Sequence, residues 1–276
     1  MERVRAIMRG SDVNRPMHST IAAAAGPIPC RNFLCGTLFY ATDMAAQGMV
    51  ITIDGPAGAG KSTVARRLAG RLGLDFLDTG AMYRGVAAAA IGGGINPADH
   101  AAVGELSRRM RIAFDWKADP PTLLIDGSPV TDRLRDPDVT AAVSEIASNG
   151  AVREVLVKAQ REIGRAHPRL VTEGRDQGSV VFPDAAVKFY LDASPAVRAR
   201  RRAEQLRAAG KPADEKQIFS QIVARDERDT KRIDGPLICP PDASRIDTSA
   251  MTLDQVVDHL AGLVAASASR RAGVPR

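Results

Sequence analysis

Short apolar runs of strand length alternate along the chain with longer segments whose apolar residues recur at helical spacing. Such runs are typical of buried parallel strands, and such segments of helices that cover a sheet. The strand-like runs are residues 49–53, 74–78, 169–173, 186–192 and 244–248. The helix-like segments are residues 63–72, 79–91, 100–110, 138–163 (as two helices), 253–264 and two that begin near residues 194 and 214. This alternation predicts an α/β fold, a parallel sheet flanked by helices.

Residues 110–134 interrupt this rhythm. Three strand-like runs, 110–116, 122–127 and 129–134, are separated by turns rich in proline and glycine. Short strands joined by such turns predict a small antiparallel sheet. We interpret it as an insertion near the ligand-binding edge of the parallel sheet, where it would recognise a substrate or only extend the scaffold.

The segment before Met49 differs in composition from the rest of the chain. Its arginines precede an uncharged stretch that resembles a targeting peptide, but Gly26, Pro27 and Pro29 interrupt the apolar run. We therefore expect residues 1–48 to be a disordered leader or the product of too early a start codon. The predicted domain spans residues 49–267, followed by a frayed tail at 268–276.

The composition restricts the function only loosely. Lysine and arginine number 38 against 32 acidic residues, a net charge of +6 that suits anionic small molecules as well as nucleic acid. Aromatic residues make up 4% of the chain, which argues against stacking platforms for single-stranded nucleic acid. Cys30, Cys35 and Cys239 have no metal-ligand spacing and form no even framework, so a reducing, cytoplasmic setting is the simplest interpretation.

The first predicted strand leads into a glycine-rich loop and then a helix. Gly55, Gly60, Lys61 and Ser62 fit the spacing of the phosphate-binding loop, G-x-x-x-x-G-K-[ST]. Glycines let backbone N–H groups surround phosphate oxygens, and the helix adds its free N-terminal N–H groups. Lys61 would then reach the outer phosphates and the Ser62 hydroxyl would hold Mg²⁺. The alternative is a plain glycine turn, but strand, loop and helix in this order predict a nucleoside triphosphate site.

Polar residues follow two other predicted strands. Tyr83 and Arg84 come after the second strand, and the strand at 169–173 ends in Glu173 and is followed by Arg175 and Asp176. Carboxyl ends of parallel strands face the crevice where α/β sheets bind ligands. These groups are therefore candidates for holding Mg²⁺ and gripping a phosphate, the alternative being a surface arginine and a salt bridge within a turn.

Two arginine-rich helices, separated by a break at residues 210–212, follow the fourth strand. Charged runs of this kind are usually solvated faces or weak nucleic-acid contacts. Because a hinge joins them, they also suit a lid that closes over polyphosphate.

Several motifs together resemble the bacterial cytidylate kinases. They are DGPAGAGKST (54–63), LDTGAMYR (77–84), EGRD (173–176) with VVFPDA (180–185), and RDERD (225–229). Their order and spacing match from residue 49 to about residue 263. The resemblance implies a P-loop kinase fold in which the antiparallel insertion belongs to a monophosphate-binding region at about 80–165 and the arginine helices form a lid at about 198–235.

The resemblance also implies the reaction. The γ-phosphoryl group of ATP, with Mg²⁺, passes to CMP or dCMP in pyrimidine nucleotide metabolism. The partners implied are small nucleotides only, with neither nucleic acid nor a membrane, and the enzyme implied is a cytoplasmic monomer. None of the four histidines falls in a matched motif, which suits a reaction whose phosphate acceptor needs no general base.

Site residues carry over position by position. The catalytic residues implied are Lys61, Arg175, Arg225 and Arg232. The ATP-binding residues implied are Gly55, Pro56, Ala57, Gly58, Ala59, Gly60, Lys61, Ser62 and Thr63, with Ser62 holding Mg²⁺ through ATP. The CMP-binding residues implied are Thr79, Arg84, Ser144, Arg153, Arg175, Asp176, Arg225, Asp229 and Arg232.

Within that set, Thr79, Arg84 and Arg175 would surround the acceptor phosphate, and Ser144, Arg153 and Asp176 would address cytosine. Arg225, Asp229 and Arg232 would contact the nucleotide as the lid closes.

Two positions depart from the family pattern. Gln177 replaces a usual methionine and Ser179 a usual threonine, and both flank the acceptor pocket. They bear on substrate preference rather than on the class of reaction.

Two other functions remain open. One is another small P-loop kinase, acting on UMP, another monophosphate or a shikimate-like metabolite. The other is a nucleotide-switched or nucleic-acid-binding ATPase whose basic helices would bind phosphodiester backbone in a strongly salt-dependent way.

Overall fold

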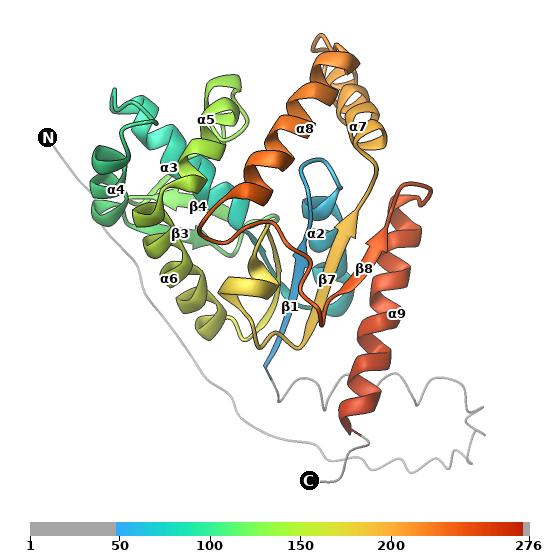
Figure 1. Cartoon of the computed structure of the whole chain (residues 1–276). Helices are drawn as coiled ribbons and strands as arrows, with labels where there is room; N and C mark the ends of the chain where they lie inside the picture. The colour runs from blue at the N-terminus through green and yellow to red at the C-terminus, as the bar shows by residue number, and fades with distance from the viewer. Residues whose placement is uncertain (1–47, 273–276) are drawn as a thin grey trace, which may run out of the picture. The chain divides into compact units, whose positions relative to one another are not determined.

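The computed structural model of the chain describes residues 48–272 (Figure 1). The leader predicted at residues 1–48 therefore lies outside the described residues, apart from Gly48. None of the described helices is long and apolar enough to cross a membrane.

A five-stranded parallel sheet forms the centre of the fold, as the alternation of patterns predicts. The strand order is β2-β6-β1-β7-β8, and each neighbouring pair is parallel. The strands are β1 (Met49–Asp54), β2 (Asp75–Asp78), β6 (Arg169–Glu173), β7 (Val187–Asp192) and β8 (Ser244–Asp247). In this order β1 lies between β6 and β7, so the loop that follows β1 emerges beside the loop that follows β6.

Helices cover both faces of the sheet, and an apolar cluster lies between the sheet and the helices on each face. The helices are α2 (Lys61–Leu72), α3 (Thr79–Gly92), α4 (His100–Arg109), α5 (Pro137–Ser148), α6 (Gly150–Ala166), α7 (Pro195–Ala208), α8 (Glu215–Lys231) and α9 (Leu253–Ala272). Leu68 of α2 and Leu260 of α9 pack in one cluster with Ile51 of β1. Val86 of α3 and Leu156 of α6 belong to the other cluster.

The antiparallel sheet is present but smaller than predicted. Its strands are β3 (Ile112–Asp115), β4 (Thr122–Ile125) and β5 (Ser128–Pro129). The third run was expected to extend to residue 134, but β5 ends at Pro129 because the chain then turns, with the Arg133 N–H donating to the Val130 carbonyl. The sheet packs on α3 at Gly85, where a Cβ would lie 2.7 Å from Leu123 Cδ2.

The structure sets two helix boundaries that the sequence pattern left open or placed elsewhere. The segment predicted as two helices is divided at Asn149, whose side-chain oxygen accepts hydrogen bonds from the Ala151 and Val152 N–H groups and so caps α6. The last helix is longer than the predicted 253–264. It continues to Ala272, so the expectation of a frayed tail from residue 268 is wrong for residues 268–272, and residues 273–276 lie outside the described part.

The helices α7 and α8 form a hairpin beyond the carboxyl ends of the strands (Figure 1). A small apolar cluster joins them, composed of Ala199, Ala203, Ile218 and Ile222. Arg201 donates a hydrogen bond to the Thr248 carbonyl at 2.6 Å, which attaches α7 to the chain after β8.

Candidate active site

The phosphate loop has a backbone that only its glycines allow. At Gly55, with φ 146°, a Cβ would lie 2.0 Å from the Leu191 carbonyl oxygen of the neighbouring strand. Gly60 takes a left-handed conformation, φ 83°, directly before α2, and no side chain caps that helix. The first N–H groups of α2 therefore remain available to an anion.

Lys61 begins α2 and is buried. Its Nζ donates a hydrogen bond to the Pro56 carbonyl at 2.8 Å. Burial, and secondarily the positive charge of Arg175, lowers the pKa of the Lys61 ammonium to about 7. The lysine is thus held against the loop, away from water and near the positive charge of Arg175. A bound anion would favour its protonated form.

The oxygen atoms of Ser62, Asp78 and Glu173 lie close together between the start of α2 and the end of β6. Ser62 Oγ donates to Glu173 Oε1 at 2.7 Å. Burial, followed by the Glu173 charge, raises the pKa of Asp78 to about 7, and the two carboxyl groups share a hydrogen bond. Burial alone would raise the pKa of Glu173, but Lys61 and the Ser62 hydroxyl outweigh it and lower that pKa. Glu173 is therefore the ionised member of the pair.

Three arginines, Arg175, Arg225 and Arg232, lie close enough to Asp229 of α8 to lower the pKa of its carboxyl, against the effect of burial. Arg175 Nε donates to Asp229 Oδ2 at 2.9 Å, and Arg225 Nε lies 4.0 Å from the same oxygen. Within the described part of the chain, Arg225 Nε is buried and has no hydrogen-bond partner. Burial, then Arg175 and, less strongly, Arg84, lowers the pKa of Arg225 to about 10. These positive charges form an incompletely neutralised cluster that suits a phosphate.

A buried ion pair lies beside this cluster. Arg153 Nη2 of α6 contacts Asp176 Oδ2, and each side chain is 5% exposed. Arg153 Nη1 donates to the Tyr83 hydroxyl at 3.2 Å. Burial, and then the Asp176 charge, raises the pKa of Tyr83 to about 12, so the phenol stays neutral. The group offers both donors and acceptors in a place sheltered from water.

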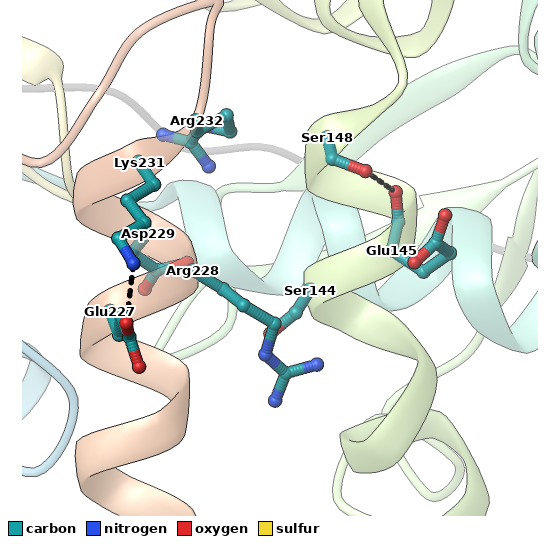
Figure 2. A pocket seen from close by; sticks show the side chains of 8 residues that line it. All are labelled: Ser144, Glu145, Ser148, Glu227, Arg228, Asp229, Lys231 and Arg232. Atoms are coloured by element: carbon teal, nitrogen blue, oxygen red, sulfur yellow. Dashed lines mark hydrogen bonds and ion pairs between the residues drawn. The ribbon is translucent and has the colours of Figure 1, made fainter.

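A cavity of about 440 Å³ opens between α5 and α8 (Figure 2). Ser144 comes from α5, while Asp229 and Arg232 come from the end of α8. The other lining residues are Glu145, Ser148, Glu227, Arg228 and Lys231. Arg232 donates its Nε to the Gly235 carbonyl at 3.0 Å and lies close enough to Arg153 to feel its charge. It therefore lies between the cavity and the buried pair.

The remaining predicted residues occupy the same end of the sheet. Thr79 Oγ1 donates to the Glu173 carbonyl at 2.7 Å, which ties the start of α3 to β6. Arg84 lies on α3 near the carboxylate of Asp78, and its charge also reaches Arg202 of α7. Thr63 lies exposed in the first turn of α2.

Sequence reasoning missed a contact between the phosphate loop and the α7–α8 hairpin. The Ala57 N–H donates to Asp226 Oδ1 at 3.0 Å, and Arg198 Nη1 donates to the Ala57 carbonyl at 2.9 Å. Arg198 and Asp226 also form an ion pair. No local signal distinguishes Arg198 from the other arginines of its helix, because its partners lie far away in the sequence.

Asp54 is a second residue without a predicted role. Its two carboxylate oxygens accept hydrogen bonds from the Gln177 N–H at 2.9 Å and the Gly178 N–H at 2.7 Å. Burial raises the pKa of Asp54 to about 7, although these two hydrogen bonds oppose the rise. The last residue of β1 thus holds the segment that follows Asp176.

Comparison with known proteins finds cytidylate kinases. A sequence profile described as "Cytidylate kinase" matches residues 51–266. The cytidylate kinase of Mycobacterium avium (strain 104) is 46% identical over 216 residues, which cover 78% of this chain and 95% of that protein. The cytidylate kinase of Corynebacterium efficiens is 47% identical over 224 residues, 81% of this chain and 97% of that protein. Among solved structures, a shikimate kinase from Bacteroides thetaiotaomicron is 15% identical with a TM-score of 0.41, covering 79% and 98% of the two chains.

Proposed function

The chain belongs to the cytidylate kinase family, and we propose that the residues gathered at the end of its sheet perform that family's reaction. The enzyme transfers the γ-phosphoryl group of ATP to CMP or dCMP and forms ADP and CDP or dCDP. The comparisons do not favour another acceptor or a nucleic-acid-binding ATPase.

The phosphate loop holds the donor. Backbone N–H groups of the glycine loop and of the start of α2 surround the phosphates of ATP, because no side chain caps that helix. Lys61 adds an ammonium that follows the outer phosphates. Support for this role comes from the burial of Lys61 against the loop and from its lowered pKa. The negative charge of a bound polyphosphate would favour the protonated lysine and raise that pKa again.

Mg²⁺ would sit beside Ser62. The Ser62 hydroxyl, Glu173 and Asp78 present the oxygen donors that Mg²⁺ prefers, and Glu173 is ionised. The described residues contain no group of three or more His, Cys, Asp or Glu side chains able to hold a metal. This suits an ion bound mostly through nucleotide phosphates, with few protein ligands. When bound, Mg²⁺ offsets negative charge on the transferred group.

The arginines hold the acceptor phosphate. That phosphate is already an oxyanion and needs no base to activate it, so the main barrier is repulsion between two negative groups. Arg84, Arg175 and Arg225 reduce this repulsion and align the acceptor with the γ-phosphate. Asp229 keeps Arg175 and Arg225 in place, and Arg232 and Thr79 complete the acceptor side.

The buried Arg153–Asp176 pair is the main support for cytosine as the nucleobase that the site recognises. Cytosine needs donors toward its carbonyl and ring nitrogen and an acceptor for its exocyclic amine. Arg153 and Asp176 supply a donor and an acceptor in one sheltered place, and Ser144, which lines the cavity between α5 and α8, supplies a hydroxyl. Uracil would turn a carbonyl toward the Asp176 carboxylate and leave buried groups unpaired.

These residue roles indicate the functions of two regions of the domain, an acceptor-binding region and a lid. The region at about 80–165 carries Arg84, Ser144 and Arg153 and binds the acceptor. The α7–α8 hairpin, within about 198–235, carries Arg225, Asp229 and Arg232 and acts as the lid. Closing a lid excludes water, which would otherwise accept the phosphoryl group.

Replacing Asp176 with Asn tests the proposed role of this residue in recognising cytosine. The variant replaces one carboxylate oxygen with an amide NH2, which repels the exocyclic amine of cytosine and can donate to the carbonyl of uracil. The ratio of kcat/KM for CMP to that for UMP should therefore fall about 10- to 100-fold. Steady-state kinetics with both acceptors at saturating ATP measure the ratio. Asp184→Asn, at an exposed position, is the matched control and should not change it. An unchanged ratio for Asp176→Asn would remove this residue from base recognition.

A further inference from the structure

Gln177 follows Asp176 directly, yet its side chain is directed into the protein. It is 1% exposed. Thr172 Oγ1 of β6 donates to Gln177 Oε1 at 2.9 Å, and Gln177 Nε2 donates to Gln160 Oε1 of α6 at 3.0 Å. Thr172 and Gln160 are both fully buried. The side-chain amide therefore connects the strand that ends at the site to the helix that carries Arg153.

The two contacts from this segment to α6 lie on one face of the helix. Arg153 and Gln160 are seven residues apart, about two turns, so their side chains lie in line along α6. Asp176 contacts Arg153, and its neighbour Gln177 contacts Gln160. The consecutive residues Asp176 and Gln177 thus contact the same face of α6 at two points, two helical turns apart.

The backbone of this segment is fixed from the opposite side. Asp54 accepts the N–H groups of Gln177 and Gly178. A π-helical turn, η1 (Gln177–Val181), begins at the same residue, and such turns often mark functional sites. A Cβ at Gly174 would lie 2.8 Å from Gln177 Cγ, so the side chain also packs beneath the loop that carries Arg175. Its place is therefore closely determined.

We propose that Gln177 is a positioning residue that sets the Asp176 carboxylate against Arg153, and thereby the discrimination of cytosine from uracil. The inference rests on the proposed role of Asp176 in base recognition. A methionine at this position would fill a similar volume but could not replace either hydrogen bond. It would leave the Gln160 oxygen and the Thr172 hydroxyl without these partners, and the segment would keep only the Asp176–Arg153 pair as a side-chain attachment to α6.

The test is Gln177→Met in the full chain, assayed with CMP and UMP. The ratio of kcat/KM for CMP to that for UMP should fall about tenfold, because a small displacement of a recognition group is costly. The change should appear in KM for CMP, while KM for ATP stays the same. Gln205→Met, at an exposed position of α7, is the matched control. A thermal midpoint that falls without any change in the ratio would show a purely structural role and overturn the proposal.

A double-mutant cycle with Asp176→Asn shows whether Gln177 acts through Asp176. The loss caused by Gln177→Met should disappear when Asp176 is already Asn, and an equal loss in both backgrounds would overturn the proposal. If Asp176→Asn alone leaves the ratio unchanged, the base assignment itself fails, which is a different result. Gln160→Met removes the same hydrogen bond from α6. It should reproduce the loss, and it decides the question if Gln177→Met does not fold.

Discussion

Three ionisable side chains of the site have pKa values moved toward neutrality from opposite directions. Burial raises the pKa of Asp54 and of Asp78 to about 7 and lowers that of Lys61 to about 7. Each of these groups is disfavoured in its charged form because the surroundings give it too little water or counter-charge. A bound nucleotide changes that balance, since its phosphates favour the cation.

We expect ATP binding to take up protons at pH 8. The pKa of Lys61 in the free enzyme is about 7, so its amine is mostly neutral at pH 8. Phosphates raise this pKa again, and the bound complex therefore holds up to about one proton more. Affinity for ATP should accordingly fall as the pH rises above about 7.

Calorimetric titration in buffers with different ionisation enthalpies measures this proton uptake. Lys61→Ala should abolish most of it and should also lower turnover about 10²- to 10³-fold while the fold stays intact. Equal uptake by the variant and the original enzyme would contradict the role given to Lys61.

At the scale of elements, the α7–α8 hairpin is attached to the phosphate loop. Asp226 of α8 accepts the N–H of Ala57, and Arg198 of α7 donates to the carbonyl of Ala57. Arg198 is almost fully buried and also donates its Nε to the Ala193 carbonyl at 2.8 Å. These contacts fix the base of the hairpin, so the closure that we propose would involve only the rest of α7 and α8.

Removing the Asp226 carboxylate should loosen this attachment. Asp226→Ala leaves Arg198 buried without its counter-charge, which should lower the free energy of unfolding by about 3 kcal/mol. Urea unfolding measures that loss. Glu204→Ala is the control, because its ion pair with Arg200 is exposed and 3.9 Å long, and it should cost less than about 0.5 kcal/mol.

The same variant should also hydrolyse more ATP when no acceptor is present, because a loosened lid admits water. A variant as stable as the original enzyme, with unchanged hydrolysis, would show that this contact does not hold the lid.

Elements governed by local patterns were predictable from the sequence, and contacts between distant segments were not. The parallel strands follow from apolar runs, and the phosphate loop from glycines at fixed spacing. The end of β5 and the length of α9 were predicted wrongly, because a turn after Pro129 and a weakly apolar helix end leave little pattern. Gln177 was placed beside the acceptor pocket, but only the structure shows its side chain directed away from solvent.

At the scale of the whole molecule, the excess of six positive charges agrees with a site that gathers two anionic nucleotides. Its guanidinium groups come from α3, the loop after β6, and α8, which lie far apart in the sequence. The fold brings them together with carboxylates that hold them, such as Asp229 for Arg175. Arg225 of α8 thus belongs to the same cluster of charges as Arg175.

The central claim is that donor loop, lid and acceptor pocket act together on cytosine monophosphates. ADP production by the full chain, with ATP, Mg²⁺ and each nucleoside monophosphate in turn, tests this most directly. CMP and dCMP should stimulate ADP production strongly, while UMP, AMP and GMP should have little effect. The same slow hydrolysis with every acceptor, and with none, would contradict the account.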